Sequence, residues 1–483
     1  MIPMTSRSDA LEQLSTQTFD LLVVGGGIIG ARIALEAALA GDRVALVDAG
    51  DFGGATSSAS SKLIHGGLRY LQMYDFGLVH ESHVERAALL SHVAPHLVTR
   101  LPFLFPLYRG GPQPPAPILG AGLLLYAALS GFRYSRAQLV RASRAREWVP
   151  SLRTEGMRWA GLYEDAQTND GRLVLATVTA AERAGAIVLN HAAVTAIEKG
   201  AAQVAGIEVH FRRSVNAAGP WVDGVRRLED SACSPMAMLS KGVHVTVPLP
   251  AGWRAALTVP LERGRVAFAV PWEGTLMLGT TDTAYSDDPS DLKPEPADVE
   301  TVLREAAIAL PPELLRPERI LTVFAGLRVL PNVAGDTAGA RREHLVQIGP
   351  TGMVSVAGGK LTTHRRIAID VLRRLDHARY RLHDDPLPGA GPLPPAPAGF
   401  DPESWKHLTR HYGSEALGVL AAGSGERIHP DGPDVWAQID HGLRCEWALT
   451  VDDLVRRRTT LQVRGLDTAE VRCRVAERLQ PIA

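Results

Sequence analysis

The stretch FDLLVVGGGIIGARIALEAALAGDRVALVD, residues 19–48, decides the fold. It opens with an apolar run of strand length, turns at a cluster of glycines, continues with a helical pattern and closes on a second apolar run. A strand, a helix and a second strand within about 30 residues are how a parallel sheet begins. We therefore predict an α/β protein with a parallel sheet that begins near its N-terminus.

Within this unit, Gly25, Gly27 and Gly30 have the GxGxxG spacing, and Asp48 comes 23 residues after the first glycine. Gly25 permits a tight turn, and Gly27 lets backbone N–H groups approach a pyrophosphate. Gly30 lets the helix pack closely, so that its positive end faces the phosphates. Asp48 is expected to accept hydrogen bonds from a ribose diol. The pattern predicts a dinucleotide site, and by itself it fits FAD and NAD equally.

Two later segments favour FAD. Residues 214–221 (SVNAAGPW) and 353–360 (MVSVAGGK) are strand ends that run into small residues, where a backbone can pass close to a flat or charged group. A helix expected from Leu361 would point its positive end at the same ligand, where it stabilises the negative charge of a reduced flavin. Three such strand ends, spread over more than 300 residues, suit a long cofactor lying across the sheet.

The region after the second strand is rich in hydroxyl groups and poor in acids. Its serines and lysine can donate to a pyrophosphate, and Gly66 and Gly67 let the backbone pass under a flavin ring. The expected donors are Ser57, Ser58, Ser60, Ser61 and Lys62.

Composition limits the class of protein. The 483 residues have a mass of 51.8 kDa, 46% hydrophobic and 21% charged residues, which is typical of a globular chain with about two to four domains. Lys and Arg total 51 and Asp and Glu 52, so the net charge of -1 predicts no nucleic-acid partner. An anionic substrate would need a local cluster of cations.

Cysteine usage excludes several kinds of site. Cys233, Cys445 and Cys473 are far apart, which argues against an iron–sulfur cluster, a cysteine-built zinc site or a disulfide framework. We expect a reducing cytoplasm, no metal, and no export signal in the first residues. The longest apolar segment, residues 117–131, is too short to span a membrane. The arginine-rich residues 132–148 follow it, and a core helix followed by a solvated one is favoured over a membrane contact.

The chain divides into a body and a C-terminal part. We predict that a body at 1–385 holds FAD-binding parts at about 15–110, 160–225 and 350–385, with an antiparallel substrate sheet at about 235–349. Residues 386–402 (PLPGAGPLPPAPAGFDP) read as a stiff linker. Residues 403–483 read as a helical cap.

Several motifs together carry a family resemblance. Residues 55–70 (ATSSASSKLIHGGLRY), with GGGIIG, NAAGPW, KGVH, GTTD, AGLR and AGGKLTTHR, closely resemble the FAD-dependent glycerol-3-phosphate dehydrogenases of the aerobic bacterial and mitochondrial type. The likeness covers nearly the whole chain, including residues 446–461 (EWALTVDDLVRRRTTL). It implies a Rossmann-like FAD domain of the glutathione-reductase/D-amino-acid-oxidase type, with an antiparallel substrate domain and a helical cap.

The resemblance also implies an activity. Such an enzyme oxidises sn-glycerol 3-phosphate to dihydroxyacetone phosphate by hydride transfer from C2 to flavin N5 and passes the electrons to membrane quinone, attached peripherally to the cytoplasmic face of the membrane. An oxidase that reduces O2 to H2O2, a related FAD-dependent hydroxy or amino acid oxidase, and a non-catalytic flavin-binding scaffold are the alternatives. The residues leave the oligomeric state open, a homodimer included.

By resemblance, the substrate faces Arg69 and Tyr70, His244, Arg328 and Lys360. Arginine suits phosphate because its planar fork donates two parallel hydrogen bonds. We expect Arg69 and Arg342 to clamp the phosphate, with the register of Arg341 against Arg342 left open. His244 would receive the proton, with Arg328 and Lys360 beside the reacting oxygen, although a buried Lys360 could serve as the base instead. Thr281 and Asp282 of GTTD are expected nearby.

The residues expected to bind FAD are Gly25, Gly27, Ile28, Ile29, Gly30, Asp48, Thr56, Ser57, Ser58, Ser60, Ser61, Lys62, His65, Gly66, Gly67, Ala218, Gly219, Trp221, Gly358, Gly359, Lys360 and Leu361. Two departures from the family pattern stand out. Arg328 is followed by Val-Leu where the family has Pro-Leu, at the edge of the site, and residues 169–172 read NDGR, which we expect to affect local packing. A charged group in the cap is expected to tie its helices together, namely Glu446, Asp452, Asp453, Arg456 and Arg457.

Overall fold

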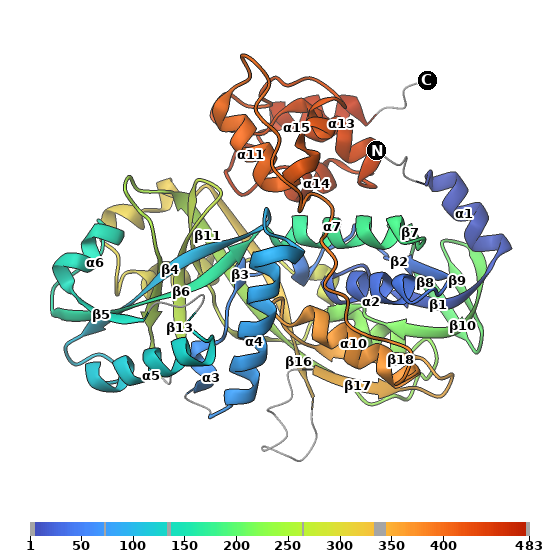
Figure 1. Cartoon of the computed structure of the whole chain (residues 1–483), viewed down its shortest axis with the longest axis horizontal. Helices are drawn as coiled ribbons and strands as arrows, with labels where there is room; N and C mark the ends of the chain where they lie inside the picture. Colours follow the sequence, from blue (N-terminus) through green and yellow to red (C-terminus); the bar gives the residue numbers. More distant parts are fainter. Residues whose placement is uncertain (1–4, 72–73, 133–136, 263–264, 333–343, 480–483) are drawn as a thin grey trace.

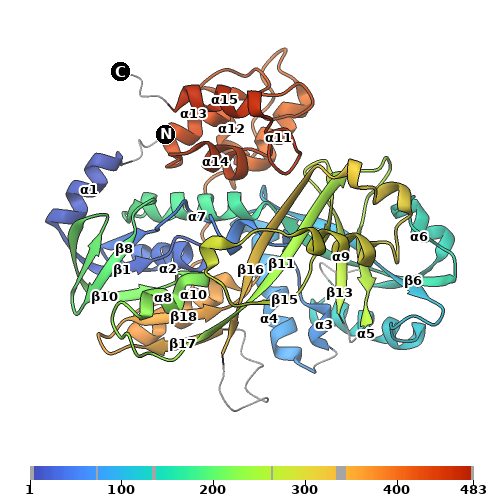
Figure 2. The same ribbon diagram turned by 180° about the vertical axis from the view of Figure 1, so that it is seen from behind.

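The computed structural model describes residues 5–71, 74–132, 137–262, 265–332 and 344–479, with only the backbone for residues 69 and 70. Two β-sheets lie side by side, and the helical C-terminal part sits above them (Figures 1 and 2). This arrangement confirms the predicted α/β fold with a second sheet and helical C-terminal residues.

The first sheet has the order β17-β18-β10-β1-β2-β7, with the β8–β9 pair extending from β10. Its strands β1, β2, β7, β10 and β18 run parallel, and β17 pairs antiparallel with β18. Helices α2, α7 and α10 pack on one another along this sheet. The bounds are β1 Thr18–Val24, β2 Val44–Val47, β7 Ile187–Leu189, β8 Val194–Glu198, β9 Ala201–Val204, β10 Ile207–Asn216, β17 His344–Ile348, β18 Val354–Gly358, α2 Ile28–Leu39, α7 Asp170–Arg183 and α10 His364–Leu375.

The register of this sheet aligns the three glycine-marked strand ends. Val24 of β1 lies opposite Asn216 of β10, and Asn216 lies opposite Ser355 of β18. The turns that follow β1, β10 and β18 therefore leave the sheet at the same edge, as the sequence predicts. Asn216 is fully buried and donates through Nδ2 to the carbonyl of Val222 (2.8 Å) and to the Ser355 hydroxyl (3.3 Å), which ties two of these turns together.

The second sheet has the order β15-β11-β14-β13-β12-β4-β6-β3, with β16 beside β11 and β5 beside β6. All its pairs are antiparallel except that of β12 with β4. The bounds are β3 Leu63–Ile64, β4 Val98–Tyr108, β5 Gln138–Arg141, β6 Met157–Thr168, β11 Ala237–Pro248, β12 Ala256–Pro260, β13 Val266–Trp272, β14 Thr275–Gly279, β15 Thr283–Tyr285 and β16 Thr322–Pro331.

This sheet is wider than the sequence predicts. Residues 98–110 were expected in an FAD-binding part, but β4 within them belongs to the second sheet, as does β6. Both strands are buried along most of their length and show little alternation of exposed and buried side chains. Their sequences therefore lack the alternating pattern by which a half-buried strand is recognised. The opposite difference occurs at β17. Residues up to 349 were expected in the substrate sheet, but β17 lies in the first sheet.

The C-terminal residues are helical and carry their own apolar clusters. Residues 386–401 form neither helix nor strand, and they are held to the body where the Leu387 N–H donates to the Val93 carbonyl (2.8 Å). The helices here are α11 Pro402–Tyr412, α12 Ala416–Leu420, α13 Trp436–Cys445, α14 Val451–Asp453 and α15 Ala469–Arg478. Those elsewhere are α1 Arg7–Thr16, α3 Leu68–Leu71, α4 Phe76–Ala88, α5 Ala116–Leu129, α6 Ala142–Trp148, α8 Val222–Arg226 and α9 Pro296–Ala306.

Buried ion pairs attach the helical C-terminal residues to the body. Glu446 pairs with Arg172 of α7 (2.6 Å), and Asp51, in the loop after β2, accepts from Arg457 and Arg458. The charged group in the cap was expected to join its own helices, and Asp453 does pair with Arg457 (2.9 Å). Glu446 and Arg457 also bridge to the body, which a helical spacing does not reveal because their partners lie hundreds of residues away.

Candidate active site

The turn between β1 and α2 requires its glycines. A Cβ built on Gly30 would lie 1.8 Å from the carbonyl oxygen of Gly25, and one on Gly25 would lie 2.5 Å from the carbonyl oxygen of Ala217. Gly25 also has φ +104°, which favours glycine. At the start of α2, the Ile28 N–H donates to the Ser57 hydroxyl (3.0 Å). The positive helix end and a hydroxyl group thus face the same space, as pyrophosphate binding requires.

Asp48 supports the glycine turn through two backbone hydrogen bonds. Its carboxylate accepts hydrogen bonds from the backbone N–H of Gly26 (2.6 Å) and of Gly50 (2.8 Å), and burial raises its pKa. We expected this side chain to face a ribose. In the structure it holds the glycine turn in shape, and a contact with ribose through its remaining lone pairs stays a prediction.

The turn after β18 meets the same place. A Cβ on Gly359 would lie 3.2 Å from the Ile29 side chain at the start of α2. Thr362 Oγ1 accepts from the His65 N–H (3.1 Å) and donates to the His65 carbonyl (3.3 Å). The segment 358–362, which contains Lys360 and Leu361, therefore lies between the α2 N-terminus and the loop that carries Gly66 and Gly67.

The serine-rich loop differs from the expectation. Ser60 Oγ donates to Asp170 (2.7 Å), and Lys62 Nζ donates to Asp170 (2.7 Å) and to the Ser58 carbonyl (2.6 Å). Ser60 and Lys62 were expected to donate to a pyrophosphate, but both side chains are committed to this carboxylate. A buried ammonium must be paired, and Asp170 is 1% exposed and lies at the first position of α7. Of the five expected donors, Ser57 is the one that lies at the α2 N-terminus.

His244 lies where the serine-rich loop meets the second sheet. On β11 it is opposite Gly279 of β14 and Phe324 of β16. Its ring stacks on Phe324 (centroids 5.0 Å apart, planes at 16°), and its Nε2 is hydrogen-bonded to Ser61 Oγ (3.0 Å). Its buried Nδ1 has no hydrogen-bond partner among the described residues. Burial, then the positive charges of Lys62 and Arg328, lower the pKa of His244 to about 3, so the imidazole is neutral at pH 7.

Arg328 is held beside His244 by the GTTD turn. Its Nη2 donates to the Thr280 hydroxyl (2.9 Å) and to the Thr281 carbonyl (3.0 Å), and its Nη1 lies 3.5 Å from Asp282 Oδ1. The Thr281 hydroxyl accepts from the Val243 N–H (2.9 Å). In the structure, Thr281 therefore fixes the turn, and Asp282 is a partner of Arg328. Burial lowers the pKa of Arg328.

Comparisons with known proteins identify the family. Residues 20–365 match the family model described as FAD dependent oxidoreductase, and residues 351–481 match the C-terminal domain of alpha-glycerophosphate oxidase. The glycerol-3-phosphate dehydrogenase of Mycobacterium leprae is 32% identical over 95% of this chain and 83% of its own. The chain belongs to this family of FAD-dependent dehydrogenases. The mitochondrial glycerol-3-phosphate dehydrogenase of Mus musculus is 31% identical over 97% of this chain and 71% of its own.

A solved structure agrees with the fold. The glycerol-3-phosphate dehydrogenase of Bacillus halodurans, complexed with FAD, superimposes with a TM-score of 0.75 and 26% identity over 99% of this chain and 97% of its own. In this dehydrogenase chain, the glycine turn, Ser57 and the 358–362 segment form a cradle lined with backbone and small side chains. That cradle fits the FAD that the family requires.

A cavity of about 320 Å³ lies beside the cradle in this dehydrogenase chain. Thr56, Ser58, Lys62 and Trp221 line part of this cavity, and Trp221 is 39% exposed. The other walls come from β16, from Trp272 and from the C-terminal residues, namely Thr322, Phe324, Ala325, Gly326, Leu327, Arg456, Thr459, Gln462 and Val463. Thr56 Oγ1 also donates to the Leu327 carbonyl (2.7 Å), so the loop and β16 are joined directly.

Some predicted site residues lie outside the described structure. These are the side chains of Arg69 and Tyr70 and all of Arg341 and Arg342. Other contributors were missed by the sequence reasoning. Phe324 stacks on His244, and Asp170, which was expected only to affect packing, binds the loop lysine. The signal in the sequence is Lys62 itself: a lysine that becomes buried needs a carboxylate partner, and its own segment contains no acid.

Proposed function

We propose that this chain catalyses the oxidation of sn-glycerol 3-phosphate to dihydroxyacetone phosphate, with bound FAD supplying the hydride acceptor. The observation that carries this proposal is the contact between Ser61 and His244. It sets a neutral, buried imidazole of the substrate sheet directly against the serine-rich loop after β2. A secondary alcohol held there would have a proton acceptor and a hydride acceptor on neighbouring sides.

His244 is the proposed proton acceptor. When a hydride leaves carbon 2, the proton of the 2-hydroxyl must move to a base, and a neutral imidazole can take it. Burial, and then the nearby charges of Lys62 and Arg328, hold the pKa of the free imidazole low. A bound phosphate dianion would offset these charges and raise that pKa, so substrate binding itself makes His244 a stronger base. Lys360 remains the alternative base.

Arg328 is proposed to steady the reacting oxygen, because its guanidinium is fixed by Thr280 and Thr281 next to His244. Arg69 and Arg342 are proposed to bind the phosphate. Those two roles come from the family resemblance alone. The pair would grip the end of the substrate remote from carbon 2, which orients the carbon for hydride transfer.

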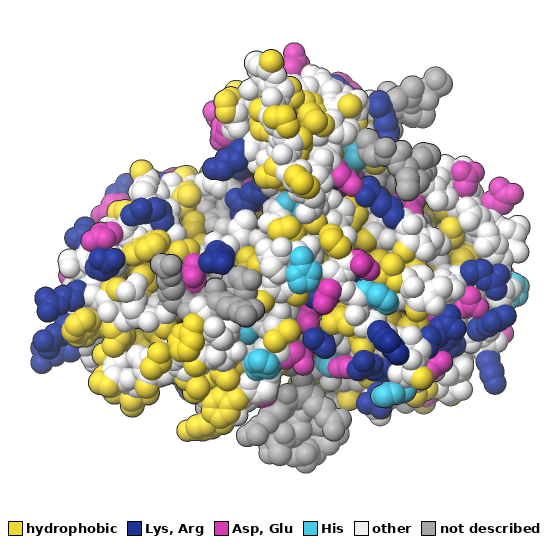
Figure 3. All heavy atoms as spheres, viewed as in Figure 1, with side chains coloured by type: hydrophobic (Ala, Val, Ile, Leu, Met, Phe, Trp, Pro, Cys, Tyr) yellow, Lys and Arg dark blue, Asp and Glu magenta, His cyan; other side chains and the backbone are white. Residues whose placement is uncertain are grey.

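The electron acceptor is proposed to be membrane quinone, reached from an apolar surface at α4 and α5. Ile118 and Leu124 of α5 are 62% and 58% exposed. Tyr74, just before α4, and Phe132, just after α5, are 78% and 61% exposed. Hydrophobic side chains gather over α3 and α5 in Figure 3. Exposed arginines at 141, 144 and 146 follow in β5 and α6, and β5 packs against α5. Apolar side chains beside cations fit the surface of an anionic bilayer. Among the described residues, no helix has the length and apolar character to cross a membrane.

An oxidase reaction with O2 is the second candidate, because residues 351–481 match a domain named for alpha-glycerophosphate oxidase. The test reduces the FAD-loaded protein anaerobically with glycerol 3-phosphate and then adds either O2 or a short-chain quinone. Reoxidation by the quinone at least tenfold faster than by air-saturated buffer supports the quinone-linked dehydrogenase. Reoxidation by O2 at the faster rate, with stoichiometric H2O2, identifies an oxidase.

A further inference from the structure

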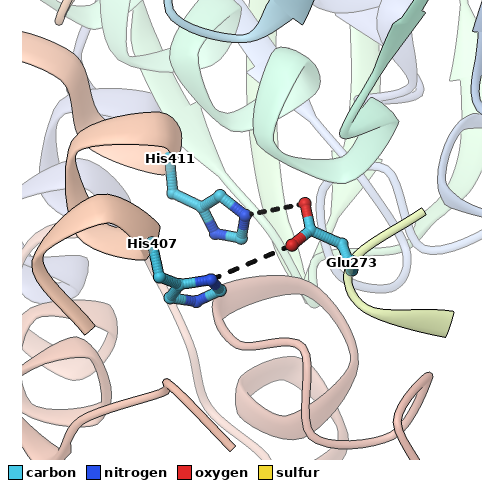
Figure 4. Close-up of side chains that lie close together, drawn as sticks. All are labelled: Glu273, His407 and His411. Carbon is cyan, nitrogen blue, oxygen red and sulfur yellow. Dashed lines mark hydrogen bonds and ion pairs between the residues drawn. The ribbon is translucent and has the colours of Figure 1, made fainter. Parts of the chain in front are cut away.

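A second cluster of histidine and glutamate side chains lies where the C-terminal helices meet the second sheet. Helix α11 places His407 and His411 one turn apart on one face, and Glu273 approaches from the turn between β13 and β14 (Figure 4). The three residues are 6%, 2% and 5% exposed in that order. None of the three residues belongs to the FAD cradle or to the surroundings of His244 described above.

The donor atoms have the spacing of a coordination site. His411 Nε2 lies 3.0 Å from Glu273 Oε1, and His407 Nδ1 lies 3.8 Å from Glu273 Oε2. One donor atom from each residue falls within 4.8 Å of the others. Nitrogen and oxygen ligands about 2.0–2.1 Å from a tetrahedral zinc ion lie about 3.3 Å apart. The two observed distances, which involve different oxygens of Glu273, fall on both sides of that value, so small side-chain movements would bring the three groups to coordinating distances.

The outer partner of His407 fixes which nitrogen faces the cluster. Its Nε2 lies 2.9 Å from Asp434 Oδ1, and Asp434 also accepts from the Thr460 N–H (2.9 Å) and hydroxyl (2.7 Å). Asp434 can only accept, so Nε2 of His407 carries a proton. Nδ1 of His407 is then the nitrogen that faces Glu273. A carboxylate behind a histidine is also the usual support of a metal ligand.

Charged groups surround the cluster. Glu273 and Asp434 are buried carboxylates, and His407 lies between them. The rings of His407 and His411 lie close together, with centroids 4.1 Å apart. Arg464 Nη2 and Arg410 Nε lie 3.8 Å and 4.0 Å from the Glu273 oxygens. Arg464 is also held by the Thr460 hydroxyl (2.8 Å), and both guanidinium groups act as outer partners of the carboxylate.

We propose that Glu273, His407 and His411 form a binding site for one divalent transition-metal ion of the zinc class, with a water molecule as the fourth ligand. Two imidazoles and one carboxylate are a donor set that zinc prefers. The ion would join α11 to the β13–β14 turn and so fasten the C-terminal helices to the body. The sequence expectation of no metal rested on the cysteines, and Glu273 lies 134 residues before His407, so its approach is invisible in the sequence.

The first test uses the full-length, FAD-loaded protein. After treatment with a chelator and dialysis, Zn²⁺ is titrated in a metal-buffered solution, and bound zinc is measured by elemental analysis. We expect the wild type to bind about one zinc ion per chain. We expect His411→Gln and Glu273→Gln to bind zinc at least about tenfold more weakly than the wild type. His441→Gln is the matched control, since this buried histidine also faces a carboxylate, Glu446, at 3.7 Å. Wild-type protein that binds less than about 0.1 zinc per chain, or variants that bind as the wild type does, would overturn the proposal.

The second test needs no variant, so misfolding cannot obscure it. Co²⁺ is added to the chelator-treated wild type, and visible absorption is recorded after subtraction of the flavin spectrum. Ligand-field bands of a four- or five-coordinate ion, removed by competing Zn²⁺, support the site. A spectrum of hexaaqua cobalt alone overturns it and leaves the cluster a hydrogen-bonded network. FAD reduction by glycerol 3-phosphate reports on the proposed function separately from either result.

Discussion

Ser61 Oγ and His244 Nε2 lie 3.0 Å apart, and this hydrogen bond joins the loop after β2 to strand β11 of the second sheet. Ser57, four residues earlier in the same loop, is instead bonded to the Ile28 N–H at the start of α2. The loop thus carries two hydroxyl groups with different tasks. Ser57 faces the cofactor cradle, and Ser61 orients the imidazole proposed to take the proton.

The two serines give a matched pair of variants. Ser61→Ala removes a hydrogen bond from His244, so we expect kcat to fall about tenfold, which corresponds to about 1.4 kcal/mol, with normal FAD content. Ser57→Ala removes a group from the cradle, so FAD should bind about tenfold more weakly while kcat of the FAD-saturated enzyme stays close to that of the wild type. The measurements are steady-state kinetics and FAD titration. The same effect of both variants on kcat at saturating FAD would contradict this division.

The depressed pKa of His244 predicts its protonation. Because burial and two cations lower that pKa to about 3, the imidazole should stay neutral as the pH falls from 8 to 5. The unfolded chain takes up this proton near pH 6.5, so His244 also lowers the free energy of unfolding as the pH falls from about 6.5 toward 3. The check is NMR of histidine-labelled protein, with the signal assigned by its loss in His244→Gln. A titration midpoint near 6.5 in the free enzyme would contradict the described environment.

The close packing of the glycine turn predicts a loss of cofactor. A Cβ on Gly30 would lie 1.8 Å from the Gly25 carbonyl oxygen, so Gly30→Ala must push α2 away from β1 and open the cradle. We expect purified Gly30→Ala to contain less than about a tenth of the wild-type FAD. Gly224→Ala in α8 is the control, because its Cβ would meet no atom within 4 Å. Absorbance at the flavin maximum per chain measures both, and full flavin in Gly30→Ala would show that the turn does not shape the site.

Membrane attachment is checked by sedimentation with lipid vesicles. We expect the protein to sediment with vesicles rich in phosphatidylglycerol and much less with pure phosphatidylcholine. Leu124→Asp, on the apolar surface of α5, should weaken this binding about tenfold. Ile348→Asp serves as control, because Ile348 is 61% exposed on β17, in the other sheet. If both aspartates weaken binding alike, the α4 and α5 surface is not the contact.

Much of the first sheet could be predicted from the sequence, because its chemistry is local. The glycine spacing, the apolar strands and the three small-residue turns each lie within one short segment. The observed register of Val24, Asn216 and Ser355 brings the three turns to one edge of the sheet. The sequence did not show where the strands of the second sheet begin and end along the chain. β4 and β6 are buried on both faces, so they lack the alternation that reveals a half-buried strand.

The sequence could predict which residues belong to the candidate site, but it could not predict which side chains they contact. His244 and Arg328 were recognised from their motifs, and the structure brings them beside the GTTD turn. Long-range contacts decided the rest. Lys62 was expected to face phosphate, yet Asp170, 108 residues away, neutralises it. A single sequence shows which groups are charged, and only the fold shows which of them must be paired.

The most direct test of the central claim is the flavin spectrum of the FAD-loaded protein under anaerobic conditions. We predict that sn-glycerol 3-phosphate bleaches the oxidised flavin band within seconds and that dihydroxyacetone phosphate forms in equal amount. The enantiomer and glycerol without phosphate should bleach it far more slowly, since each lacks the fit that positions carbon 2. A fully loaded protein whose flavin band stays unchanged with sn-glycerol 3-phosphate would contradict the proposed activity.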